Sequence, residues 1–138
     1  MIIFFFFVSS KTIAQDSSII SFKLNQIRNI PCSQIKKGIS GNKISDVAFN
    51  SIIAQDTFAI PFLISFLTDT TTSKVKNQIA NSYYKKGDLA LILINYIEWI
   101  PFATLTQLQW CLCCECGNLP SSFLQYFGAN RFEFKERY

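Results

Sequence analysis

Cysteines are the residues of this sequence whose type and spacing could carry chemistry. Four of the five lie within a six-residue stretch, and the fifth lies far upstream; they are Cys32, Cys111, Cys113, Cys114 and Cys116. The cluster contains two interleaved C-x-x-C spacings, and the first follows Trp110, as in the W-C-x-x-C of thioredoxin-like enzymes. Such an active site follows a β-strand, with a strand-rich half still to come. Here helical patterns precede the cluster and 24 residues follow Cys114, so we do not expect a redox enzyme.

These thiols could instead bind a metal ion or form disulfides. Thiolates at this density can hold Zn²⁺ or Cu⁺, but a structural zinc site gathers ligands from separate parts of the chain, and the sequence has no His. One or two structural disulfides are the simpler interpretation for a small domain in an oxidising compartment. Cys32 with Cys116 is the pairing we favour, because both lie in predicted loops. One of the five thiols then stays free.

Glu98 is the remaining candidate for catalysis. Without His the commonest general base is missing, and the sequence has no G-x-S-x-G, P-loop or G-x-G-x-x-G motif. Glu98 lies on the most apolar predicted helix, where a buried carboxylate would have a raised pKa and could act as an acid. It could equally be paired with a Lys or Arg, or lie at the helix rim. We therefore expect no catalytic residue, no bound metal and no cofactor.

The composition is that of one globular domain that does not bind nucleic acid. Of the 138 residues, 49% are hydrophobic and 14 are Phe, which supplies ample core material. The net charge of +4 is spread along the chain. The densest basic pairs, Lys36–Lys37 and Lys85–Lys86, lie far apart, whereas nucleic-acid binders gather positive charge on one stripe or patch.

The first residues resemble a secretory signal peptide. Ile2 to Val8 is a short apolar run, and Thr12 and Ala14 are small residues placed for cleavage after Ala14 or one residue later. No Lys or Arg precedes the run, and a buried N-terminal strand or helix is the alternative interpretation. We expect a signal peptide over residues 1–14, a single α-helical domain over residues 15–138, and a periplasmic or secreted location.

Apolar spacing predicts helices throughout the domain. The predicted segments are Asp16–Ile30, Ser45–Ala54 with Ser45 as N-cap, a mostly buried helix with Ile60, Leu63, Ile64 and Leu67 on one face, Leu89–Ile100 opened by Asp88, Phe102–Trp110, Pro120–Phe127, and a last helix opened by Asn130. The segment 89–105 is apolar enough for a membrane-spanning helix to be considered, but Asn95 and Glu98 would then lie within the bilayer. We therefore expect a buried core helix and no integral membrane span.

Two stretches resemble known proteins. The segment Phe58 to Asp69, with the sequence Phe-Ala-Ile-Pro-Phe-Leu-Ile-Ser-Phe-Leu-Thr-Asp, followed by Lys74-Val75-Lys76, resembles one HEAT-type helical repeat over Ser45 to Tyr83. That resemblance implies a helix pair in which Lys74 to Lys76 opens the partner helix. Motifs between Gly87 and Tyr126 resemble uncharacterised secreted bacterial proteins, with no activity implied. The expected fold is an all-α, compact single-domain helical bundle with HEAT-like helix pairs.

Three functions follow from these observations. The leading hypothesis is an extracytoplasmic, non-enzymatic binding or accessory protein, such as an inhibitor, an immunity-type factor or an assembly partner, that acts on a partner protein. One alternative is a metal-binding protein that uses Cys111 to Cys116. The other is a small enzyme that uses Glu98.

Overall fold

The structure is a computed structural model that describes residues 9–31, 46–77, 80–110 and 119–138. Its elements, in chain order, are α1 (Ser9–Gln26), α2 (Val47–Ile53), the 3-10 helix η1 (Asp56–Ala59), α3 (Ile60–Phe66), β1 (Thr72–Asn77), β2 (Ser82–Lys85), α4 (Lys86–Ile97), α5 (Phe102–Thr106), α6 (Ser121–Ala129) and α7 (Arg131–Arg137).

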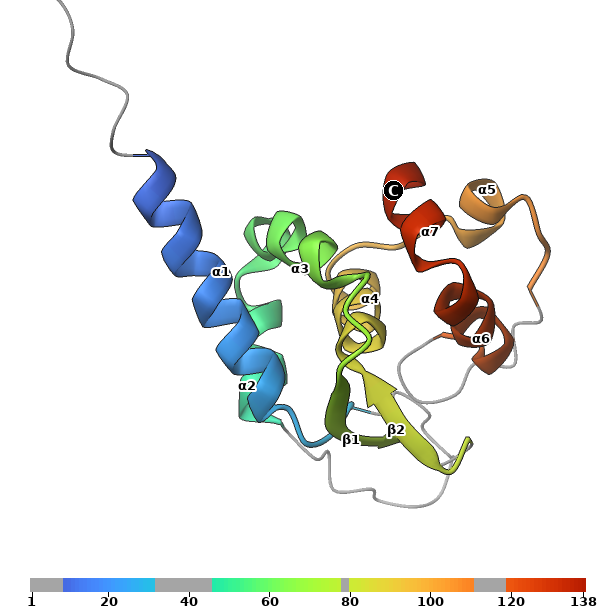
Figure 1. Cartoon of the computed structure of the whole chain (residues 1–138), viewed down its shortest axis with the longest axis horizontal. Helices are drawn as coiled ribbons and strands as arrows, with labels where there is room; N and C mark the ends of the chain where they lie inside the picture. Colours follow the sequence, from blue (N-terminus) through green and yellow to red (C-terminus); the bar gives the residue numbers. More distant parts are fainter. Residues whose placement is uncertain (1–8, 32–45, 78–79, 111–118) are drawn as a thin grey trace, which may run out of the picture.

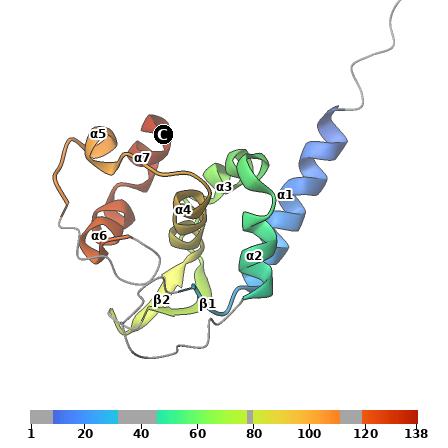
Figure 2. The same cartoon turned by 180° about the vertical axis from the view of Figure 1, so that it is seen from behind.

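Helix α4 lies at the centre of the fold, as predicted for a core helix. Every residue from Leu89 to Ile94 is buried. Helices α1, α2 and α3 lie on one side of α4 and helices α5, α6 and α7 on the other, while the two strands lie beneath it (Figures 1 and 2). A helix enclosed in this way needs apolar residues all round, which explains its continuous apolar run. It ends at Ile97, earlier than predicted, and Glu98 is already extended.

The prediction of an all-α bundle is wrong, because β1 and β2 form an antiparallel sheet. In β1 the side chains alternate between buried and exposed, with Ser73 and Val75 inside and Thr72, Lys74 and Lys76 outside. This period of two is that of a half-buried strand. Lys74 to Lys76, expected to open the partner helix of a HEAT-like pair, therefore lies in a strand instead. The turn before β2 places Asn81 at a φ of 46°, a left-handed conformation that Asn tolerates.

The helix predicted around Leu63 is present but less buried than expected. Ile60, Leu63 and Leu67 are buried, whereas Ile64 is only partly so. Phe58 is 83% exposed. It precedes α3 in the 3-10 helix η1, so it does not continue the apolar stripe of α3.

Helix α1 begins earlier than predicted, at Ser9, and ends at Gln26. The predicted cleavage position after Ala14 therefore lies inside a helix. The face of α1 turned to the core carries Ile20 and Leu24, and Ile27 just beyond the helix is also buried. Asp46 caps α2 by accepting the N–H of Phe49, while Ser45, the predicted cap, lies outside the described residues.

Three short helices build the C-terminal half at roughly the predicted places. Aromatic side chains of these helices form a cluster in which Phe123 contacts Phe102 and Phe134, and Phe127 contacts Phe134 edge-on. The last helix begins directly after Asn130, as predicted, but the Asn130 side chain makes no capping hydrogen bond and donates to the carbonyl of Tyr126 instead.

No single helix in the described part of the chain is both long and apolar enough to cross a membrane. Helix α2 and the segment formed by η1 and α3 are long and apolar enough only when taken together, and they are bent by 104° relative to each other.

Candidate functional site

The predicted thiol sites fall outside the described residues. Cys32 and the cluster from Cys111 to Cys116 belong to the segments 32–45 and 111–118. Their disulfides and their metal binding therefore stay predictions. Among the residues that the structure describes, no three His, Cys, Asp or Glu side chains come close enough to hold a metal ion.

Glu98 lies at the surface. It caps the C-terminal end of α4 and is exposed, which agrees with the interpretation that it lies at the helix rim. Its carboxylate accepts a hydrogen bond from the hydroxyl of Tyr138. Burial of Tyr138, and then the hydrogen bond and negative charge of Glu98, raise the pKa of that phenol. This hydrogen bond ties the last residue of the chain to the end of α4.

Helices α1 and α2 enclose a hollow of about 610 Å³ on the outer side of the molecule. Phe22 and Lys23 of α1 line one wall, and Val47 and Ser51 of α2 line the other. Phe22 is 63% exposed and Val47 is 80% exposed. The ammonium of Lys23 reaches across the hollow toward the carbonyl of Ser51, at 3.4 Å.

A second hollow, of about 530 Å³, continues along the same side of α1. Ile19, one helical turn before Phe22, lines it together with Phe58 and Phe62. Since α1 and α2 lie side by side and run in opposite directions (Figures 1 and 2), the two hollows follow each other along α1. We call the combined surface the α1–α2 groove; its residues are Asp16, Ile19, Phe22, Lys23, Val47, Ser51, Phe58 and Phe62.

Asp46 fixes the end of the α1–α2 groove. Besides capping α2, its carboxylate accepts the backbone N–H groups of Arg28, at 2.8 Å, and Asn29, at 3.0 Å. The chain that leaves α1 is thereby tied to the start of α2. Burial acts to raise the pKa of Asp46, but the N–H groups of Phe49, Arg28 and Asn29 outweigh it and lower that pKa.

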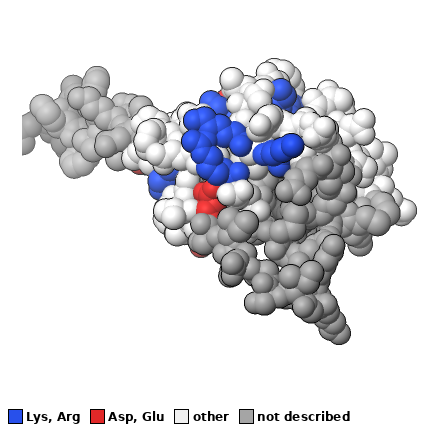
Figure 3. Space-filling model, turned by 90° about the horizontal axis from the view of Figure 1, so that it is seen from below, with Lys and Arg blue, Asp and Glu red and all other residues white. Residues whose placement is uncertain are grey.

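A second surface is basic. Three lysines lie on the two strands of the hairpin, and the view from below shows Lys and Arg side chains on this side of the molecule, with acidic surface beside the largest basic patch (Figure 3). The sequence did not reveal this, because Lys74 and Lys76 were assigned to a helix. Their spacing of two residues, beside Val75 and the two tyrosines of the next strand, was the signal for a strand.

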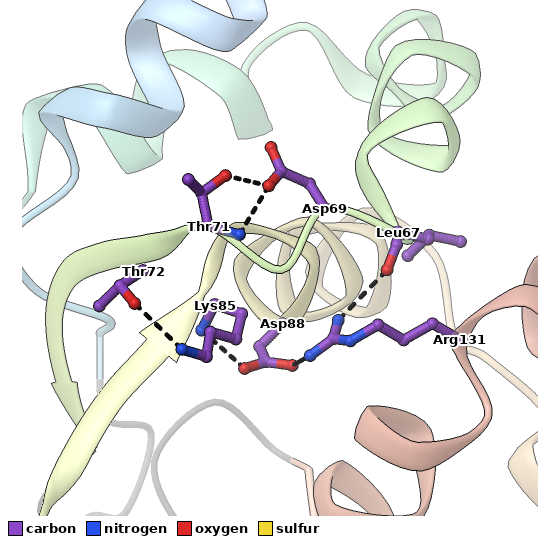
Figure 4. A network of polar contacts seen from close by, with 7 residues as sticks. All are labelled: Leu67, Asp69, Thr71, Thr72, Lys85, Asp88 and Arg131. Atoms are coloured by element: carbon purple, nitrogen blue, oxygen red, sulfur yellow. Dashed lines mark hydrogen bonds and ion pairs between the residues drawn. The ribbon is translucent and has the colours of Figure 1, made fainter.

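A buried polar network links the two halves of the fold (Figure 4). Arg131 of α7 pairs with Asp88 and also donates to the carbonyl of Leu67, at 3.2 Å. The other oxygen of Asp88 accepts the N–H of Lys85 at the start of α4. Each of these groups has a partner, and the two hollows described above lie elsewhere, so the network holds the structure together and we assign it no catalytic role.

Comparisons of the chain with protein families, with curated proteins and with solved structures found no match.

Proposed function

We propose that this chain is an extracytoplasmic, non-enzymatic binding protein that recognises an amphipathic helix of a partner protein in the α1–α2 groove. The observation that carries the proposal is the exposure of large apolar side chains along both walls of one groove. Exposed apolar residues scattered singly need no explanation, but those gathered around a hollow mark interaction sites. Ile19, Phe22, Val47 and Phe58 are gathered in this way.

The shape of the groove favours a helix as its occupant. Two antiparallel helices leave between them a straight furrow into which the side-chain ridge of a third helix can pack. The stretch of α1 from Asp16 to Gln26 is about 15 Å long, which corresponds to about three helical turns. A helix there would present apolar residues at positions i, i+3, i+4 and i+7, the usual pattern of helix-in-groove recognition.

Charges at the two ends give the occupant a direction. Asp16 lies at one end, whereas Lys23 and Arg28 lie with Asp46 at the other, which therefore keeps a net positive charge. The positive end of a helix dipole is its N-terminus, so the occupant runs with its N-terminus toward Asp16. A carboxylate on its last turn would meet Lys23 and Arg28. The metal-binding and Glu98 hypotheses stay predictions from the sequence, and no described contact favours either.

Selection of helical peptides on the purified protein tests the proposal. A phage-displayed library of amphipathic helices is enriched on the wild-type chain, and the selected peptides are measured by fluorescence anisotropy. We expect apolar residues at helical spacing with a carboxylate toward the C-terminal end. Phe22→Ser should weaken their binding by about 30-fold, the effect of a hot-spot residue.

Phe132→Ser is the matched control, because Phe132 is 77% exposed on α7, away from the groove. It should leave peptide binding unchanged. Equal binding by the Phe22→Ser protein would overturn the proposal. So would a dimer in sedimentation experiments that Phe22→Ser dissociates, because a second copy would then occupy the groove.

A further inference from the structure

The outer face of the β1–β2 hairpin gathers three lysines and a tyrosine. Lys74 and Lys76 point outward from β1, since the residues between and before them are buried. Directly opposite residues of an antiparallel pair share a face of the sheet. The register pairs Lys76 with Tyr83 and Thr72 with Lys85, which places Tyr83 and Lys85 on this same face.

Within the described residues, no carboxylate forms an ion pair with the lysines of this face. Neither strand contains an Asp or Glu. Within the described residues, the ion pairs join Arg131 to Asp88 and Arg137 to Glu133, so none of the three lysines takes part in one. The ammonium of Lys85 donates to the hydroxyl of Thr72, at 3.0 Å, which holds it on the face without cancelling its charge.

We propose that this face docks the protein on an anionic phospholipid bilayer. Successive outward positions of a strand lie about 7 Å apart, so Lys74 and Lys76 form a short row on the outer face of β1. A lysine near an anionic membrane is attracted to its headgroups, and Tyr83, which is 53% exposed, is a side chain suited to the polar interface. Tyr83 is the exposed tyrosine of β2, since Tyr84 is buried. One exposed ring beside three lysines favours an anionic bilayer over a single-stranded nucleic acid, which is usually bound along a groove lined with several aromatic side chains.

This inference is independent of the proposed function, because it uses other residues. The α1–α2 groove contains no residue of the hairpin. Helix α1 contacts β1, so a protein docked through the hairpin would hold the groove close to the membrane surface.

Sedimentation with lipid vesicles tests the proposal. The full-length protein is mixed with vesicles of phosphatidylcholine alone or with added phosphatidylglycerol. We expect binding to the anionic vesicles only, and binding that falls as salt is raised, because exposed charges are screened. The double variant K74E/K76E should bind at least about 30-fold more weakly, since two lysine contacts are lost.

The double variant K135E/R137E is the matched control, because it changes the net charge by the same amount on α7. It should retain binding to anionic vesicles, as should Phe22→Ser. Circular dichroism confirms that each variant is folded. Equal binding by K74E/K76E and the wild type would overturn the proposal, as would loss of binding in Phe22→Ser. Tighter binding to a single-stranded oligonucleotide than to the vesicles at the same salt concentration would overturn it in favour of nucleic acid.

Discussion

Arg131 and Asp88 form an ion pair between the last helix and the central one, with Nη2 of the guanidinium 2.5 Å from Oδ1 of the carboxylate and side chains that are 7% and 14% exposed. The same guanidinium lies over the ring of Phe127, with its carbon 4.6 Å from the ring centre. Since Asp88 also accepts the N–H of Lys85, one carboxylate joins β2, α4 and α7. The position of the C-terminal helices against the core depends on this contact.

Replacement of Arg131 by Met should lower the free energy of unfolding by about 3 kcal/mol, because it leaves the carboxylate of Asp88 buried without a counter-charge. Urea unfolding followed by circular dichroism measures the loss. Arg137→Ala is the control, since it breaks an exposed i,i+4 pair with Glu133. It should cost about 0.5 kcal/mol or less. Similar losses in the two variants would show that the Arg131 pair contributes no more than a surface pair.

A second prediction concerns Gly87, which lies in the first turn of α4 beneath this network. A Cβ atom there would come 2.4 Å from Nη1 of Arg131 and 2.4 Å from the carbonyl oxygen of Leu67. The backbone carbonyl cannot move aside easily, so Gly87→Ala should destabilise the protein by more than about 1 kcal/mol. Thermal unfolding of the purified variant measures the effect.

Gly128→Ala is the matched control for Gly87→Ala. A Cβ atom at Gly128, in α6, meets nothing within 4 Å. Alanine is a better helix former than glycine by up to about 1 kcal/mol, so this variant should be as stable as the wild type or more so. Equal melting temperatures of the two alanine variants would contradict the close approach of Arg131 and Leu67 to Gly87.

The burial of the central helix could be predicted from the sequence because its apolar run is continuous. An unbroken apolar run from Leu89 to Ile94 leaves a buried helix as the main interpretation, and those residues are buried. The hairpin was missed because its strands are short and largely polar. The segment from Thr70 to Ser73 fits a turn as well as it fits the start of a strand. The pairing of two strands depends on tertiary contacts, which a local sequence pattern does not reveal.

The α1–α2 groove could not be predicted for a related reason. Helix α1 has apolar residues on more than one face, and periodicity alone does not say which face meets the core. Packing buries Ile20 and Leu24 and leaves Ile19 and Phe22 outside. Ser45 was the predicted cap of α2, but Asp46 caps it. The contacts of Asp46 with Arg28 and Asn29 bridge 17 or 18 residues and have no local signal.

Asp46 gives the fold a predicted sensitivity to acid. Its folded pKa is lowered from the ordinary 3.8. The ionised form is therefore favoured in the folded state, and the resulting stability is fully present above the unfolded pKa. That stability is lost as the pH falls below 3.8 and through the lower folded pKa.

Comparison of Asp46→Asn with the wild type isolates this effect, because other carboxylates titrate in both proteins. An amide oxygen can still accept one of the N–H groups, but it does not titrate. Urea unfolding at a series of pH values should therefore show a difference in the free energy of unfolding between the two proteins that is large at neutral pH and becomes smaller in acid. A difference that stays constant with pH would contradict the lowered pKa.

The last prediction concerns the thiols. If Cys32 and Cys116 form a disulfide, they close a loop of about 85 residues, and loop-closure entropy assigns such a bridge roughly 4–4.5 kcal/mol. That is a large part of the 5–15 kcal/mol typical of a domain, so a reductant should lower the melting temperature clearly. A chelator should leave it unchanged, and a non-reducing peptide map should show Cys32 in a disulfide. A map with Cys32 as a free thiol, together with zinc or copper found by elemental analysis, would instead favour the metal-binding hypothesis.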